Sequence, residues 1–221
     1  SKSVGSDDAP WRGTLLGNGH TININIESGS YSYAALFPKV YSVTITDLHV
    51  KGKVNGGEHS AGLIGGATGG SSNQPTITLN HVWVSVETTT TSTHAGGIIG
   101  HSDYAVVSMN DVLFDGKVTA SSSGGAVGKI IGWCNGGSWS LQRVYDNGSG
   151  SAEWVRFCID FSPGRGSWVG WSSNSGSFTV TRDNWQGMNQ NDKTDQSEVV
   201  SLMNGKQAGT WHLVNNKAVP V

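Results

Sequence analysis

A short apolar phrase recurs four times along the chain at nearly constant spacing. The copies begin at Ile45, Leu79, Met109 and Leu141 and read I-T-D-L-H-V, L-N-H-V-W-V, M-N-D-V-L-F and L-Q-R-V-Y-D. They lie 34, 30 and 32 residues apart. Repeats of this length are typical of chains that stack one supersecondary unit per repeat. We therefore interpret each repeat as one coil of a solenoid.

A second phrase, flanked by glycine, follows in the first three coils. It reads A-G-L-I-G at 61–65 and A-G-G-I-I-G at 95–100. In the third coil two registers fit, G-G-A-V-G at 124–128 or G-K-I-I-G at 128–132. An earlier relative, A-A-L-F, occupies 34–37. Short apolar runs separated by Gly, Ser, Thr and Asn predict strands joined by turns, and the glycines are expected to supply corners with positive φ.

Stacking of the coils explains why the apolar positions repeat. A coil of about 30 residues is too small to bury its own apolar side chains, but neighbouring coils about 4.8 Å apart place like residues above like. Two inward ladders are expected: Ile45, Leu79, Met109 and Leu141 form the first, and Leu48, Val82, Val112 and Val144 form the second. The pattern predicts an all-β fold, a right-handed parallel β-helix or solenoid over residues 11–185.

Both ends of the chain depart from the repeat. Residues 1–10 are predicted to be a polar leader and residues 186–221 a C-terminal capping segment, because open solenoid edges need covering. A capping-box spacing, an apolar stripe and a following glycine predict one short helix near 195–204. The sequence T-W-H-L-V at 210–214 is predicted to be the last strand.

The composition narrows the possible partners. The 221 residues carry a formal net charge of -2 and only 14% charged residues, against roughly 25% in typical soluble domains. The chain has no basic cluster, which argues against nucleic-acid binding. No run of about 18 apolar residues occurs, so membrane insertion is not expected. The length suits one domain with a real core.

The residues that could carry metal or redox chemistry are scattered. Cys134 and Cys158 lack a C-x-x-C spacing, and either a disulfide or two free thiols would fit their similar local phrases. Neither calcium-loop nor zinc-binding spacings are present. We therefore expect no cofactor and no metal site.

The glycine-flanked phrases resemble those of the GLUG-motif proteins, whose bacterial members include adhesin-like surface proteins. The sequence G-L-I-G at 62–65 fits that motif directly, and G-I-I-G at 97–100 is a near match. The segments around Trp11 and Leu202 look similar to the family's first and last segments. The resemblance implies a β-solenoid on a bacterial cell surface and implies no catalytic centre.

The fifth residue of each apolar phrase is expected to point outward. These residues are His49, Trp83, Leu113 and Tyr145. Stacked, they would form an aromatic and apolar stripe on an otherwise polar surface, which is typical of a contact site for sugars or a partner protein. The alternative is that the C-terminal segment covers the stripe.

Seven of the nine tryptophans occur from Trp133 onward. Trp133 and Trp139 are the best candidates for a carbohydrate platform because glycine- and asparagine-rich turns flank them. The alternative is that these large side chains fill the less regular end of the solenoid.

The third residue of each phrase forms a charged column of Asp47, His81, Asp111 and Arg143. Opposite charges on neighbouring strands stabilise each other, so a ladder that fixes the register is one interpretation. The other is a glycosidase pair of Asp47 and Asp111, two rungs and roughly 9–10 Å apart.

These observations lead to one functional hypothesis and two rivals. The hypothesis is a non-catalytic, extracellular module for adhesion or for contact with a glycan or surface protein, with His49, Trp83, Tyr145, Trp133 and Trp139 as contact residues. One rival is a carbohydrate-active β-helix enzyme. The other is a structural spacer of a longer surface protein.

Overall fold

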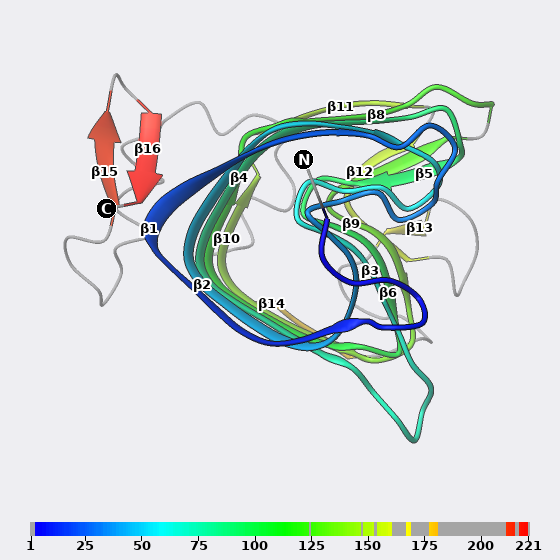
Figure 1. Ribbon diagram of the computed structural model, residues 1–221, viewed down its shortest axis with the longest axis horizontal. Helices are drawn as coiled ribbons and strands as arrows, with labels where there is room; N and C mark the ends of the chain where they lie inside the picture. Colours follow the sequence, from blue (N-terminus) through cyan, green and yellow to red (C-terminus); the bar gives the residue numbers. More distant parts are fainter. Residues whose placement is uncertain are drawn as a thin grey trace.

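Parallel strand pairing organises the chain into a β-solenoid of about four turns (Figure 1). The structure is a computed structural model. It describes residues 3–123, 125–146, 148–152, 154–160, 167–168, 177–180, 211–214 and 217–220. Within strands, the side chains of Gln142, Arg143, Tyr145, Trp154 and all residues from 156 onward lie outside that description. The described part is all-β, which confirms the predicted fold class.

The strands fall into one large sheet and one hairpin. They are β1 (Trp11–Glu27), β2 (Phe37–Gly56), β3 (Ile64–Thr68), β4 (Thr76–Thr90), β5 (His94–Gly96), β6 (Ile99–Asp103), β7 (Val106–Phe114), β8 (Lys117–Ala120), β9 (Ala126–Asn135), β10 (Ser138–Asp146), β11 (Ser149–Ser151), β12 (Trp154–Asp160), β13 (Ser167–Trp168), β14 (Ser177–Val180), β15 (Trp211–Val214) and β16 (Lys217–Pro220). Strands β1, β2, β4, β7 and β10 stack in that order along one side, and β2, β3, β6, β9 and β12 along the other.

The stacking register matches the repeat. Ile45 pairs with Leu79, Leu79 with Met109, and Met109 with Leu141. The second ladder runs from Leu48 through Val82, Val112 and Val144 in the same way. All eight side chains are at most 1% exposed. Burial of each contributes roughly 1.5–3 kcal/mol, so these ladders form the main core of the solenoid.

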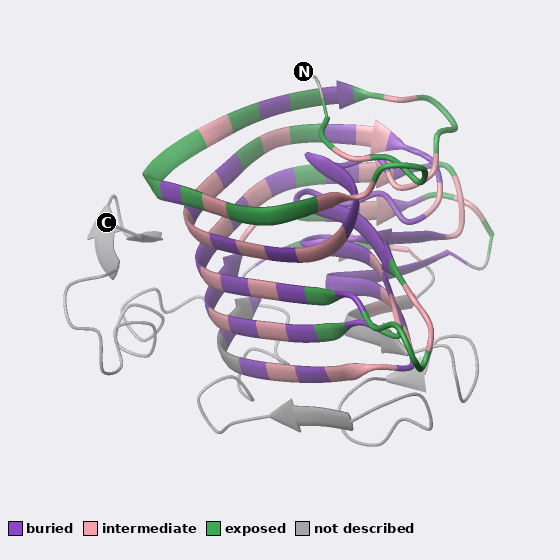
Figure 2. Cartoon of the chain, turned by 60° about the horizontal axis from the view of Figure 1, so that its bottom comes forward, coloured by how far each residue is buried: buried purple, intermediate pink, exposed green. Residues whose placement is uncertain are grey.

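Buried and partly exposed residues alternate along the stacked strands, whereas β1 is mostly exposed (Figure 2). The alternation follows from the period of two in a strand, which sends successive side chains inward and outward. The exposed first strand is the open N-terminal edge of the stack. Residues before it pack across the first coil, where the Ser3 hydroxyl donates to the Ala35 carbonyl.

The register settles which glycine phrase belongs to the third coil. Ile64 pairs with Ile99, and Ile99 pairs with Ile131. The third copy is therefore G-K-I-I-G at 128–132. The chain runs along β5, reverses tightly at the phrase and leaves along β6 (Figure 1).

The phrase glycines serve close approach and not positive φ, which corrects the expectation from sequence. A Cβ on Gly96 would lie 1.9 Å from the Ile99 carbonyl oxygen, and one on Gly100 would lie 1.8 Å from the His59 carbonyl oxygen. The repeating corners with positive φ are instead Asp47, His81 and Asp111.

These corner residues form the charged column that the sequence indicated. Asp47, His81 and Asp111 have φ of 53, 56 and 56°. Asp and His tolerate the left-handed region better than most residues. His81 Nδ1 lies 2.6 Å from Asp47 Oδ1, while His81 and Asp111 are buried. The geometry agrees with a register-fixing ladder; the side chain of Arg143 lies outside the description.

The C-terminal predictions have mixed outcomes. The helix near 195–204 falls outside the described residues. Strand β15 agrees with the predicted strand at 210–214, but it is not the last one, because β16 follows and pairs with it antiparallel. Cys134 is buried, and its partner in the strand register is Asp160, while Cys158 pairs with Ile131. Among the described residues no helix is long and apolar enough to cross a membrane.

Candidate ligand-contact site

The predicted outward column exists and is only partly exposed. Thr21, His49, Trp83, Leu113 and Tyr145 follow one another in the strand register. His49 and Trp83 are partly exposed, but Leu113 is fully buried despite its outward position. The side chain of Tyr145 is not among those described. The open part of the column is therefore its N-terminal half.

The two aromatic rings in this half stack on each other along the solenoid axis. The ring centroids of His49 and Trp83 are 3.7 Å apart and the planes differ by 4°. Stacking along the axis turns the ring edges, and not their faces, toward solvent. A partner therefore meets ring edges and the polar groups beside them.

A chain of hydrogen bonds runs beside the stacked rings. The Trp83 Nε1–H donates to Asp115 Oδ1 at 2.8 Å, and the Ser85 hydroxyl donates to the same oxygen. His49 lies between two hydroxyls, with Nε2 3.2 Å from Ser85 Oγ and Nδ1 3.2 Å from Thr21 Oγ1. We call these five residues the His–Trp face.

The direction of these bonds defines the tautomer of His49. Ser85 has a single hydroxyl proton, which goes to Asp115, so His49 Nε2 must donate to Ser85 Oγ. Nδ1 then accepts from Thr21. Burial, aided by the charge of Lys51, lowers the pKa of His49 to about 4, so the imidazole is neutral at pH 7.

The chemistry of the face differs from that of a hydrolytic triad. In a triad the carboxylate orients the imidazole, and the imidazole accepts the proton of the nucleophilic hydroxyl. Here Asp115 accepts the proton of Ser85, and His49 donates to that hydroxyl. The arrangement fixes side chains in place and does not activate Ser85.

The two tryptophans predicted as a platform have separate environments. Trp139 is 2% exposed and lies within the core, which agrees with the core-filling alternative and leaves it no surface for a ligand. Trp133 is partly exposed, on β9, and pairs in register with His101. Neither adjoins the His–Trp face in the strand register.

Trp133 belongs instead to a cluster of aromatic and imidazole rings that the sequence analysis missed. His59 stacks on His101 with centroids 4.5 Å apart, and His94 lies 5.6 Å from His59. Trp133 packs edge-on against His94 at 4.5 Å, and Tyr33 lies 5.2 Å from His59. We call these five residues the histidine cluster.

Charge in the histidine cluster is concentrated at one edge. His94 Nδ1 lies 2.7 Å from Glu58 Oε1, to which Thr93 also donates. Burial opposes a low pKa for Glu58, but the hydrogen bonds from His94 and Thr93 lower it. Burial lowers the pKa of His59 and of His101 to about 3, with neighbouring positive groups adding to the effect. Both imidazoles are neutral at pH 7.

A repeated signal for this cluster was present in the sequence. His59 stands three residues before the first glycine of its phrase and His94 two residues before, within H-S-A-G-L-I-G and H-A-G-G-I-I-G. Ser60 and Ala95 form a bridge, which places the two histidines in the same column. The third coil has Ala126 there, so the column ends.

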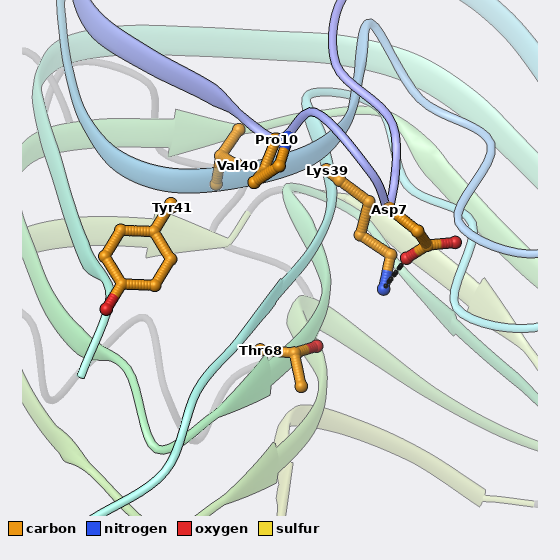
Figure 3. Close-up of a pocket in the computed structure, with 6 residues that line it drawn as sticks. All are labelled: Asp7, Pro10, Lys39, Val40, Tyr41 and Thr68. Atoms are coloured by element: carbon orange, nitrogen blue, oxygen red, sulfur yellow. Dashed lines mark ion pairs between the residues drawn. The ribbon is translucent and has the colours of Figure 1, made fainter. Parts of the chain in front are cut away.

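A small pocket lies beside the cluster near the N-terminus (Figure 3). Asp7, Pro10, Lys39, Val40, Tyr41 and Thr68 line a cavity of about 70 Å³. The Lys39 ammonium lies 3.0 Å from Asp7 Oδ1 and 3.2 Å from the centre of the Tyr33 ring. The volume is below the roughly 300–1,000 Å³ of ligand pockets, so this pocket admits water and not a sugar.

Within the described ranges, no three His, Cys, Asp or Glu side chains are placed to hold a metal ion. Comparisons with protein families, with curated proteins and with solved structures find no match for this chain.

Proposed function

We propose that this chain is a non-catalytic, extracellular module that contacts a host or microbial glycan or surface protein through the His–Trp face. The observation that carries the proposal is the stack of His49 on Trp83, held by hydrogen bonds to Asp115 and Ser85 on the outer side of the coils. Rings fixed before binding lose little conformational entropy on binding. The ring edges of His49 and Trp83, with the Thr21 hydroxyl beside them, form a row of polar groups to which an extended partner can bind.

The proposed location is a bacterial cell surface. It rests on the resemblance of 62–65 and 97–100 to the GLUG motif and on a surface rich in Gly, Ser, Thr and Asn. Low net charge gives little long-range attraction to phosphates, which favours a neutral partner over a nucleic acid. A glycan offers the hydroxyl groups that ring N–H, hydroxyl and carboxylate groups recognise.

The carbohydrate-active enzyme remains the rival. Its candidate carboxylates, Asp47 and Asp111, occupy corners with positive φ, and Asp111 is buried. On the His–Trp face the hydrogen-bond directions oppose activation of Ser85. These points favour binding without turnover.

Binding to a glycan panel tests the proposal. We expect the purified chain to bind a subset of glycans, and the Trp83→Ala variant to lose at least tenfold in affinity, because it removes both the stack on His49 and the bond to Asp115. The matched control is Tyr31→Ala, which removes an aromatic side chain that is 47% exposed elsewhere on the surface. It is expected to bind like the unmodified chain.

Thermal unfolding of each variant separates lost contact from lost fold. Equal binding by folded Trp83→Ala and the unmodified chain would reject the His–Trp face as the contact surface. Release of shortened or unsaturated sugar products would establish the enzyme rival instead.

A further inference from the structure

Two neighbouring coils carry a paired exchange of buried residues. By register, Lys129 occupies the position held by Gly97 in the preceding coil, since Gly96 pairs with Gly128 and Ile99 with Ile131. Asp146 pairs with Phe114. Gly97 and Phe114 each lie one coil before their counterparts Lys129 and Asp146, and a Cβ on Gly97 would lie 2.7 Å from the Phe114 ring. A glycine facing a phenylalanine has thus been replaced by a lysine facing an aspartate.

The exchanged pair is fully inside the solenoid. The Lys129 and Asp146 side chains are 1% and 2% exposed, and Lys129 Nζ lies 2.5 Å from Asp146 Oδ2. Asp146 Oδ1 accepts a hydrogen bond from the Gly148 N–H at 3.0 Å. Each carboxylate oxygen therefore has its own partner, and one of those partners is an amine.

A buried ion pair is costly, because both charges lose their hydration and their mutual attraction often does not offset that loss. Conversion of the two groups to a neutral amide would remove both charges from the core. The released water has a place to go, since a cavity of about 330 Å³ lined by Lys129, Gly148, Ser149, Gly150 and Val155 adjoins the pair.

We propose that Lys129 and Asp146 join in an intramolecular isopeptide bond. The Nζ of Lys129 attacks the Cγ of Asp146, a Nζ–Cγ bond forms and the Cγ–Oδ2 bond breaks. Oδ2 leaves as water with its own proton and one proton from Nζ. No oxidant, reductant or further reactant takes part, and the product is an amide that links β9 to β10.

The local groups suit each part of this step. Amide formation needs an unprotonated amine and a protonated acid, and proton transfer across the short Nζ–Oδ2 contact produces both. Burial raises the pKa of Asp146 to about 7, even though Lys129 and the Gly148 hydrogen bond oppose the rise. The Gly148 N–H points at Oδ1, where negative charge develops during the attack.

Intact-mass measurement of the folded, purified chain tests the proposal. The expected mass is lower than the sequence mass by one water molecule. Proteolysis should yield a branched peptide that joins the segments around residues 129 and 146. Lys129→Arg keeps a buried cation but lacks the amine, so its mass should equal the sequence value. Lys53→Arg, at an exposed ion pair of 3.2 Å with Glu87, is the control and should keep the deficit.

The mass and the peptides of the unmodified chain test the proposal even if a variant fails to fold. A full sequence mass with separate linear peptides would overturn the proposal and leave a noncovalent pair. A water deficit carried by a linear peptide, such as a succinimide at Asp115-Gly116, would also overturn it. This inference does not depend on glycan binding.

Discussion

Replacement of Gly100 by alanine is expected to lower the free energy of unfolding by more than about 4 kcal/mol, a loss comparable to the whole stability of many domains. The added Cβ would lie 1.8 Å from the His59 carbonyl oxygen and 2.6 Å from that of Gly65. Both obstacles are backbone atoms of the preceding coil, so the coils must separate. Urea unfolding followed by circular dichroism measures the effect.

Gly70→Ala is the matched control for this substitution. A Cβ on Gly70 meets no atom within 4 Å, and its φ is not in the left-handed region. We expect a change within about 1 kcal/mol of the unmodified chain. If Gly100→Ala proved as mild as Gly70→Ala, the close stacking of coils at the glycine phrase would be contradicted.

Acid is expected to destabilise the protein strongly through the histidine cluster. The folded chain holds His59 and His101 neutral down to about pH 3, whereas an unfolded histidine gains its proton near pH 6.5. The unfolded state therefore binds more protons between these values, and stability falls as the pH falls. From pH 7 to pH 4.5 we expect a loss of roughly 3–5 kcal/mol in the free energy of unfolding.

Stability is lost because the groups around His59 and His101 do not stabilise the protonated, charged imidazoles. His59 Nδ1 is buried and has no hydrogen-bond partner within the described part of the chain. Lys39 and His94 add positive potential at His59, and the carboxylate of Glu58 offsets only part of it at His101. Protonation would therefore bury an unpaired donor beside other cations.

Urea titrations at pH 7 and pH 4.5 measure this prediction. The double variant His59→Gln, His101→Gln should show less than half of the loss, because its side chains do not titrate. Asp146 and Lys129 are the same in both proteins, so any contribution from this buried pair cancels in the comparison. Equal losses in the two proteins would show that the histidine cluster is not responsible.

The strand stacking could be predicted from sequence because it follows from simple periodicity. The inward ladders beginning at Ile45 and Leu48 repeat at the spacing of one coil, and only parallel stacking places such positions together. The role of the phrase glycines was harder to predict. Whether a glycine supplies positive φ or close approach depends on which backbone lies opposite, and that is decided by the neighbouring coil.

The outward column was predicted at the correct positions, but its exposure was not. Register placed Leu113 below Trp83, yet whether an outward side chain meets solvent depends on chain segments far away in sequence. The repeat of apolar residues could not predict the stacking of His49 on Trp83 either, because that stacking depends on the side-chain rotamers, which turn the ring edges outward. No single histidine predicts the histidine cluster, although histidine recurs before the glycine phrases of the first two coils.

The Lys129–Asp146 pair also could not be predicted from the sequence alone. The G-K-I-I-G register of the third phrase contains Lys129. The lysine can be interpreted only once the strand register shows that Asp146 takes the position of Phe114 in the next coil. A residue that departs from the repeat is therefore informative when the residue facing it departs as well. Two such residues together identify a position whose role is not apolar packing.

The central claim is that the chain stacks in parallel coils with a defined register, and zero-length carbodiimide cross-linking of the unmodified chain tests it most directly. Glu87 pairs in register with Lys53 in the coil before it and with Lys117 in the coil after it. We expect mass spectrometry to find Glu87 joined to both lysines. Links from Glu87 to other lysines, with neither of these two, would contradict the stacked register and with it the solenoid.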